Sequence, residues 1–342
     1  MKSAGTAKRR QTAIAFTLAT ALLAGACGQA TVAPPTSVAR STTSTTQGPH
    51  VAPTRAGWSI PRRLGRGASL TALQCPTATF CLAGDDAGHL YRYDGASWSK
   101  AITTAPLGPP HHAIALSCAD AAFCAALVVG ANRVAAFDGR TWTDAATIVG
   151  AHGLQAVSCA TSRFCVTIDA VGDAFYFDGS SWSPGSNDWG SVQMISCRSR
   201  SFCASVSGGI STFNGGSWSE PSVDGATTSF SGVSCPTAAF CVAVDASGQV
   251  LGFNGAAWHP VATLDASVAG PFGATADLTG VSCSSPTRCV AVDNEGDVFS
   301  YDGQRWSGAV AVDAGHALTA VSCAQGGFCA ATDARGAVTM IR

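Results

Sequence analysis

Hydrophobic and polar residues alternate in short runs along the chain after residue 57, and Gly, Asp or Asn ends most of these runs. Between Leu278 and Trp306 the runs are "LTGVSC", "RCVAVD" and "DVFSYD", followed by a short segment at the tryptophan. A two-residue period between such breaks predicts β-strands, and the "DG" and "NG" steps favour tight hairpins. We find no stretch with the 3.6-residue period of a helix. The pattern therefore predicts an all-β protein.

The strand pattern occurs seven times. Each copy carries two cysteines six positions apart, and the first six copies continue with "[YF]-[DN]-G-x-x-W". The pairs are Cys75 and Cys81, Cys118 and Cys124, Cys159 and Cys165, Cys197 and Cys203, Cys235 and Cys241, Cys283 and Cys289, and Cys323 and Cys329. Copies follow one another every 38 to 48 residues, and four strands per unit of about 40 residues are typical of a propeller blade. We predict a seven-bladed β-propeller with four-stranded antiparallel blades over residues 57–342.

The two ends of the repeat region complement each other. The seventh copy stops at Arg342 after three predicted strands and has no tryptophan, whereas Trp58 precedes the first copy without a repeat of its own. Trp58 lies 17 positions before Cys75, the spacing that most copies use between tryptophan and the next cysteine. We therefore expect the N-terminal strand to become the outer strand of the last blade and to close the ring without an open edge.

The cysteine spacing places each pair across a hairpin loop, where opposed residues lie close enough for an unstrained disulfide. A zinc site is the alternative, but it needs four ligands, and each copy supplies two cysteines and no repeated histidine. We predict seven local disulfides. The repeated tryptophans and aromatic residues are expected to pack between blades rather than to stack on a ligand.

The first 26 residues have the order of a secretory signal: four basic residues precede the apolar run "AIAFTLATALLAGA", which is too short to span a membrane as a stable helix. The following "LLAGAC" resembles the lipobox of bacterial lipoproteins, which implies a lipid-modified Cys27 at the mature N-terminus; an ordinary cleavage site is the alternative. Residues 27–56 are rich in Thr, Ser and Pro and predict an unfolded tether. We expect an exported protein, lipid-anchored on the extracytoplasmic face of the cell membrane, where disulfides persist.

Composition narrows the function. Hydrophobic residues make up 46% of the 342 positions and charged residues 12%, which fits a folded domain. The chain holds 20 basic and 21 acidic residues, so loss of the four basic residues of the signal leaves a net charge of about −5. This charge argues against binding nucleic acid. We find no G-x-S-x-G, H-E-x-x-H or phosphate-binding glycine loop, and we expect a monomer.

Five copies carry an aspartate four positions after the second cysteine, and copies two and four carry Val128 and Ser207 there. The aspartates are Asp85, Asp169, Asp245, Asp293 and Asp333. We expect them at the ends of second strands, next to the face that carries the crossovers between blades. There they form a partial carboxylate ring at the channel mouth that could bind a cation or a hydroxyl-rich ligand. The "DxxG" pattern favours the other interpretation, in which each aspartate caps a turn before a glycine.

Three other features extend the candidate ligand-binding site. Asp173 in "DAVGD" and Asp297 in "DNEGD" add a second carboxylate and suggest Ca²⁺ as the one candidate cofactor, although the ligand count falls short of a full calcium motif. His259, in the crossover after the fifth copy, and Trp189, in the third crossover, depart from the repeat. Loops on a rigid scaffold often carry function.

The seven "C-x5-C … [YF]-[DN]-G-x-x-W" units behind a lipobox resemble the exported β-propeller lipoproteins of GC-rich Gram-positive bacteria, and more distantly the WD40-like and sialidase-like propellers. The resemblance implies a fold and no single activity. The arginine triad and the "S-x-D-x-G-x-x-W" box of sialidases are missing. We expect a non-catalytic module that binds an envelope protein or glycan at the crossover face. The alternatives are a glycan-directed hydrolase or lyase that uses Asp169, Asp293 and His259, and a purely structural spacer.

Overall fold

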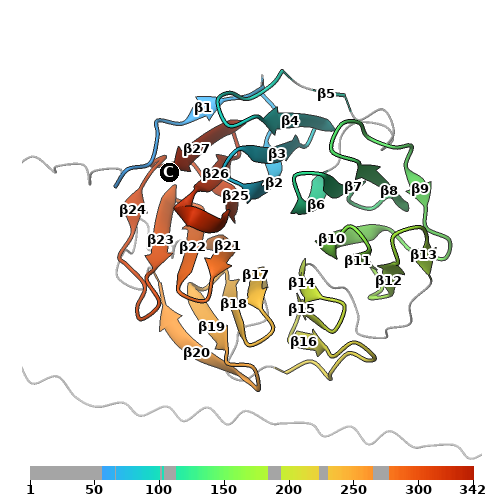
Figure 1. The fold of residues 1–342 in the computed structure, drawn as a ribbon. Coiled ribbons are helices and arrows are strands. Elements are labelled where there is room, and N and C mark those ends of the chain that lie inside the picture. The colour runs from blue at the N-terminus through green and yellow to red at the C-terminus, as the bar shows by residue number, and fades with distance from the viewer. Residues whose placement is uncertain are drawn as a thin grey trace, which may run out of the picture. The chain divides into compact units, whose positions relative to one another are not determined.

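A computed structural model describes residues 56–65, 67–100, 102–103, 113–183, 194–222, 230–264 and 277–342. Seven antiparallel sheets from these residues stand around a central axis as the blades of one ring (Figure 1). The all-β, seven-bladed propeller is confirmed. The described residues contain one short 3-10 turn, Gln325–Gly327, and none of their helices is long and apolar enough to cross a membrane.

Each blade uses consecutive strands from the axis outward. The innermost strands are β2 (Leu70–Thr77), β6 (Ile114–Asp120), β10 (Leu154–Thr161), β14 (Met194–Ser199), β17 (Phe230–Thr237), β21 (Leu278–Ser285) and β25 (Leu318–Cys323). The second strands are β3 (Phe80–Asp85), β7 (Phe123–Val128), β11 (Phe164–Asp169), β15 (Phe202–Val206), β18 (Phe240–Asp245), β22 (Arg288–Asp293) and β26 (Cys329–Asp333). The third strands are β4 (His89–Tyr93), β8 (Arg133–Phe137), β12 (Ala174–Phe177), β16 (Ile210–Phe213), β19 (Gln249–Phe253), β23 (Asp297–Tyr301) and β27 (Ala337–Ile341).

The outer strands have two residues each, except β20, which has six. They are β5 (Ile102–Thr103), β9 (Ala146–Thr147), β13 (Trp182–Ser183), β20 (Trp258–Thr263), β24 (Val310–Ala311) and β1 (Arg62–Arg63). We number the blades 1 to 7 in chain order, so that blade 1 is β2 to β5 and blade 7 is β25 to β27 with β1. Blade 4 differs from the expected four strands: outside β16 it has two isolated bridges, Phe213 with Trp218 and Ile210 with Ser222.

The N-terminal strand closes the ring, as the sequence predicts. β1 pairs antiparallel with β27, Arg62 opposite Val338 and Arg63 opposite Ala337, and the two strands lie side by side in Figure 1. The Ser59 amide donates to the Met340 carbonyl at 2.7 Å. Trp58 is 6% exposed and packs in the apolar cluster between blades 6 and 7. Each repeat tryptophan likewise packs against the preceding blade, so Trp58 supplies the residue that the seventh copy lacks.

All seven predicted disulfides are present between the first and second strands, with Cα–Cα distances of 3.9 to 4.1 Å. A serine before the first cysteine adds a contact that we did not predict. In six blades its hydroxyl accepts a hydrogen bond from the first-cysteine amide of the next blade, at 2.8 to 3.0 Å. These serines are Ser117, Ser158, Ser196, Ser234, Ser282 and Ser322, and blade 1 has Gln74 instead. The disulfides fix each hairpin, and the serines tie neighbouring blades together around the axis.

The "[DN]-G" turns after the third strands are capped by their own side chains. In each of the six turns the Asp or Asn Oδ1 atom accepts hydrogen bonds from the amides two and three residues on. The glycines that follow have φ between 88° and 102°, a region that other residues rarely adopt. Asparagine can replace aspartate here because its amide oxygen can accept the same hydrogen bonds.

This cap predicts an acid response. The backbone amides of Ser181 and Ser180 and the Ser180 hydroxyl stabilise the Asp178 carboxylate and lower its pKa to about 2. Since this pKa lies below the unfolded value, the contribution to stability is complete above about pH 4 and is lost as the pH falls through about 2. Asp178→Asn keeps the cap and removes the titration. We expect its unfolding free energy, measured by urea unfolding with near-UV circular dichroism, to fall less between pH 4 and pH 2 than that of the parent or of Asp144→Asn, an exposed control. An equal fall in all three proteins would contradict this role.

Candidate functional site

The five predicted aspartates lie at the ends of the second strands β3, β11, β18, β22 and β26, and each is at most 1% exposed. In every case the Oδ1 atom accepts hydrogen bonds from the backbone amides two and four residues on, at 2.6 to 3.1 Å. Buried carboxylates need such partners. The turn-capping role that the "DxxG" pattern favours therefore accounts for their shared position.

The central channel has a volume of about 620 Å³ and is lined by the seven innermost strands and their flanking residues. None of the five aspartates is among the described residues that line it. The carboxylates therefore lie within the blades and form no ring around the channel. Whether they bind a ligand stays a prediction.

Asp85 has two side-chain partners besides the turn. Its Oδ2 atom lies 3.0 Å from Nδ1 of His89 and accepts a hydrogen bond from the Tyr91 hydroxyl at 2.9 Å. Burial of the phenol is the main reason that the pKa of Tyr91 lies far above its ordinary value, and the hydrogen bond to the Asp85 carboxylate is the second. Tyr91 therefore stays protonated and acts here as a hydrogen-bond donor.

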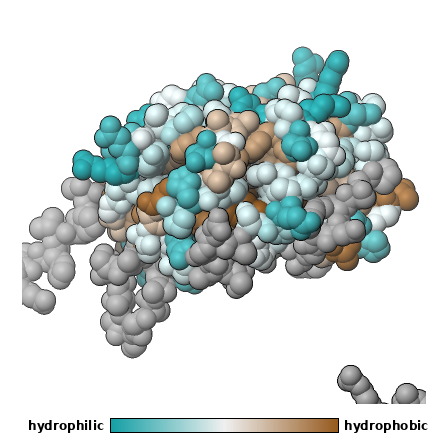
Figure 2. All heavy atoms as spheres, turned by 90° about the horizontal axis from the view of Figure 1, so that it is seen from below, coloured by the Kyte–Doolittle hydropathy of each residue, from teal (hydrophilic) through white to brown (hydrophobic). Residues whose placement is uncertain are grey.

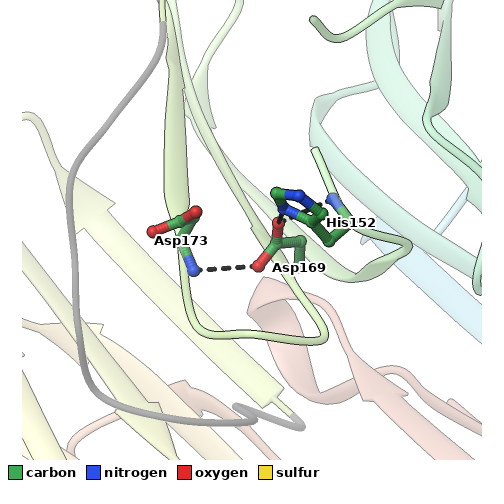
Figure 3. Close-up of side chains that lie close together, drawn as sticks. All are labelled: His152, Asp169 and Asp173. Carbon is green, nitrogen blue, oxygen red and sulfur yellow. Dashed lines mark hydrogen bonds and ion pairs between the residues drawn. The ribbon is translucent and has the colours of Figure 1, made fainter. Parts of the chain in front are cut away.

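The turn of blade 3 gathers three potential metal ligands, His152, Asp169 and Asp173 (Figure 3). Their ligand atoms lie within 4.8 Å of one another. The His152 amide donates to Asp169 Oδ2 at 2.8 Å, and His152 Nδ1 lies 3.5 Å from the same oxygen. Calcium takes six to eight oxygen ligands, and this group offers two carboxylates and an imidazole. The donor set does not fit Ca²⁺, and the backbone bonds of Asp169 explain its position without a metal.

A third group lies where blades 6 and 7 meet. Arg335 donates to Asp333 Oδ2 through Nε at 3.1 Å and to both oxygens of Asp313 through one terminal nitrogen at 2.9 and 3.0 Å. Burial raises the pKa of Asp313, whereas at Asp333 burial is outweighed by backbone and side-chain hydrogen bonds together, which lower the pKa. The pKa values of the two carboxylates therefore differ, and Asp313 takes up a proton before Asp333 as the pH falls. His316 Nδ1 lies 3.4 Å from Asp313 Oδ1.

The remaining candidates fall elsewhere. His259 lies within the outer strand β20, opposite Gly252, rather than in a crossover loop, because β20 continues to Thr263. Cys27 and Trp189 lie outside the described residues, as do residues 1–26 of the predicted signal. His152, His89 and Arg335 are polar partners that the sequence analysis did not single out. His89 and Arg335 stand four and two residues after a capping aspartate, which is the signal that could have found them.

The structure does not bring together the three residues of the hydrolase alternative. Asp169 belongs to blade 3, Asp293 to blade 6 on the opposite side of the ring, and His259 to the outermost strand of blade 5 (Figure 1). Acid–base catalysis requires that a group lie within hydrogen-bond reach of the atom it protonates or deprotonates. These three residues therefore do not form one catalytic centre.

Comparison with known proteins identifies solved structures that share this fold. No family model matches this chain, and no curated protein sequence does. Among solved structures, the WD40 repeats of RRP9 superpose with a TM-score of 0.71 at 11% identity, covering 85% of this chain and 98% of that one. YCF48 bound to a D1 peptide gives 0.66 at 13% identity, covering 83% and 94%, and U3-55K gives 0.66 at 12%, covering 85% and 99%. At these identities the likeness shows that the chain shares the propeller fold.

Proposed function

We propose that this protein is an exported, lipid-anchored propeller that binds a protein partner at its crossover face and catalyses no reaction. The predicted signal and lipobox support the location, as do seven disulfides, since such bonds persist in oxidising compartments. The seven disulfides and the closed ring provide a rigid platform. A rigid platform lowers the entropic cost of binding.

The observation that carries the proposal is the exposure of two valines, one in the crossover from blade 2 to blade 3 and one in the turn after β11. Val149 is 86% exposed and Val171 is 51% exposed, and both are among the few large hydrophobic side chains that lie in solvent in the described part of the chain. The Ala170 amide donates to the Gly153 carbonyl at 2.9 Å, so the turn with Val171 is held against the crossover that carries Val149. We call Val149 and Val171 the valine pair.

Polar groups flank the valine pair. His152 follows Val149 by three residues and is 64% exposed in its side chain, and the half-buried Asp173 follows Val171 by two residues. Protein interfaces commonly combine an apolar centre with a polar rim of this kind. YCF48, which shares the fold, has been solved with a bound peptide, and this supports a polypeptide as the class of ligand.

The proposal predicts that negative charge at the valine pair abolishes partner binding. Val149→Asp combined with Val171→Asp should lower the amount of protein retained from a solubilised envelope extract by at least tenfold, because burying each carboxylate at the interface requires its desolvation. Ile60→Asp places the same charge at an exposed residue, 76% accessible, that precedes the closing strand β1, and should retain the parent amount. Equal retention by all three proteins would contradict this site. Thermal unfolding of each variant checks that the fold is intact.

A further inference from the structure

A second cavity opens at the outer rim between blades 5 and 6. It has a volume of about 780 Å³, within the range of small-ligand pockets. Its walls include Phe240, Phe253, Phe299, Tyr301 and Trp306, and the described residues that line it contain no carboxylate. Figure 2 views the rim from the side of β20 and β16 and shows apolar side chains gathered within a mostly polar surface. The cavity combines an aromatic interior with an open mouth.

Gly252 lines the cavity and is the smallest residue at its position in the repeat. It lies on the third strand at the position that pairs with the residue after the second cysteine. In the other six blades this position holds a residue with a side chain: Arg92, Ala136, Tyr176, Thr212, Ser300 or Met340. The residue is large in three of these blades, at Arg92, Tyr176 and Met340, whereas Gly252 has no side chain to occupy the corresponding space.

Blade 3 shows what fits in that space. Tyr176 occupies the matching position and reaches into the gap toward blade 4, with its ring centroid 5.6 Å from that of Phe213. Its hydroxyl accepts a hydrogen bond from the indole nitrogen of Trp218 at 2.9 Å. Between blades 5 and 6, Tyr301 and Trp306 correspond to Phe213 and Trp218, with ring centroids 5.3 Å apart in both pairs. Gly252 offers no hydroxyl to Trp306.

Basic side chains at the mouth of the cavity restrict the class of ligand further. His259 and Arg305 are both exposed, and Arg305 carries a long contact, 3.8 Å, to Asp302. With no carboxylate in the lining, these groups favour acidic neighbours in a bound chain.

From these contacts we propose that the cavity between blades 5 and 6 binds a tyrosine side chain of an acidic peptide segment. The phenol ring takes the place that the Tyr176 ring takes in blade 3, and its hydroxyl accepts a hydrogen bond from Trp306 Nε1. Acidic residues beside the tyrosine face Arg305 and His259. This inference adds a rim site to the proposed binding function and does not use the valine pair.

The test uses synthetic tripeptides and a variant that fills the cavity. A Cβ atom at Gly252 would lie 2.9 Å from Val261 Cγ1, so Gly252→Tyr is combined with Val261→Ala to make room, and Val261→Ala alone is the matched control. Gly252 does not have a positive φ, so its backbone accepts tyrosine. We expect acetyl-Glu-Tyr-Glu-amide to bind Val261→Ala at least tenfold more tightly than the filled variant. Acetyl-Glu-Phe-Glu-amide and acetyl-Lys-Tyr-Lys-amide should each bind the control several-fold more weakly, and acetyl-Glu-Ala-Glu-amide should not bind.

A second readout keeps the proposal testable if the filled variant does not fold. In the parent protein labelled with ¹⁵N-tryptophan, the Trp306 indole N–H resonance, assigned with Trp306→Phe, should move downfield on addition of the tyrosine peptide and stay in place with the phenylalanine peptide. The inference would be overturned if the control and filled variants bound the tyrosine peptide with equal affinity, or if the Trp306 indole resonance did not shift when this peptide was added. Retention of an envelope protein through the valine pair in the same preparations would then leave the proposed function standing.

Discussion

Reduction of the seven disulfides is expected to unfold the ring. Each bridge joins cysteines six positions apart, and the chain-entropy model assigns roughly 2 kcal/mol to a loop of this size. Seven such contributions, roughly 14 kcal/mol in an additive model, are comparable with the entire stability of a typical domain. We expect the oxidised protein to melt cooperatively and the reduced protein to lack its near-UV circular dichroism signal at 25 °C.

The experiment has to allow for burial of the sulfur atoms. Cys165 is 0% exposed, and the second cysteine of five other blades is equally buried, so the bonds must be reduced in denaturant before the protein is returned to buffer. Cys159→Ala with Cys165→Ala removes one bridge without reductant. This double variant should lose about 2 kcal/mol of unfolding free energy. A reduced protein that melts at the temperature of the oxidised one would show that the bridges contribute nothing.

Loss of the closing strand is the second large effect. Trp58 packs with Val290 and Val321 between the last two blades, and β1 covers the edge of β27. Trp58→Ala should lower the unfolding free energy by about 3–5 kcal/mol, because a large buried side chain leaves a cavity. Deletion of residues 57–64 should cost more, since it also exposes the edge of β27.

The matched control for ring closure is a deletion of N-terminal residues that lie outside the predicted propeller. Removal of residues 28–55, the predicted tether, should leave the midpoint of urea unfolding unchanged. Equal midpoints for both deletions would contradict closure by the N-terminal strand. A Trp58→Ala protein as stable as the parent would contradict it independently.

The repeat made the architecture predictable from the sequence. Fixed spacings of cysteine, aromatic residue and tryptophan define the first hairpin and the turn after the third strand, and the unmatched Trp58 indicates the closing strand. The repeat also favours turn capping for the five aspartates, because a residue that recurs at the same place in each blade usually has a structural role there. Their burial and backbone bonds have this form in the structure.

The candidate sites were less predictable because they depend on departures from the repeat. In the sequence Gly252 is one of several glycines in predicted strands. Its place in the cavity lining is evident only from the structure, in which Tyr176 occupies the matching position beside Trp218. The sequence predicts His259 in a crossover loop, but β20 extends from Trp258 to Thr263 and includes it, so that His259 lies on the outer rim. Val149 and Val171 are ordinary strand-forming residues in sequence, and only their exposure marks them.

The most direct test of a non-catalytic binding function follows retained species and new products together. The purified full chain, with its disulfides formed, is incubated with fractionated envelope material, and mass spectrometry follows what stays bound and what is newly formed. We predict a retained protein that is lost from the Val149→Asp, Val171→Asp variant, with no new product above a control without the chain. A product whose formation depends on the chain would contradict the account and identify the protein as an enzyme.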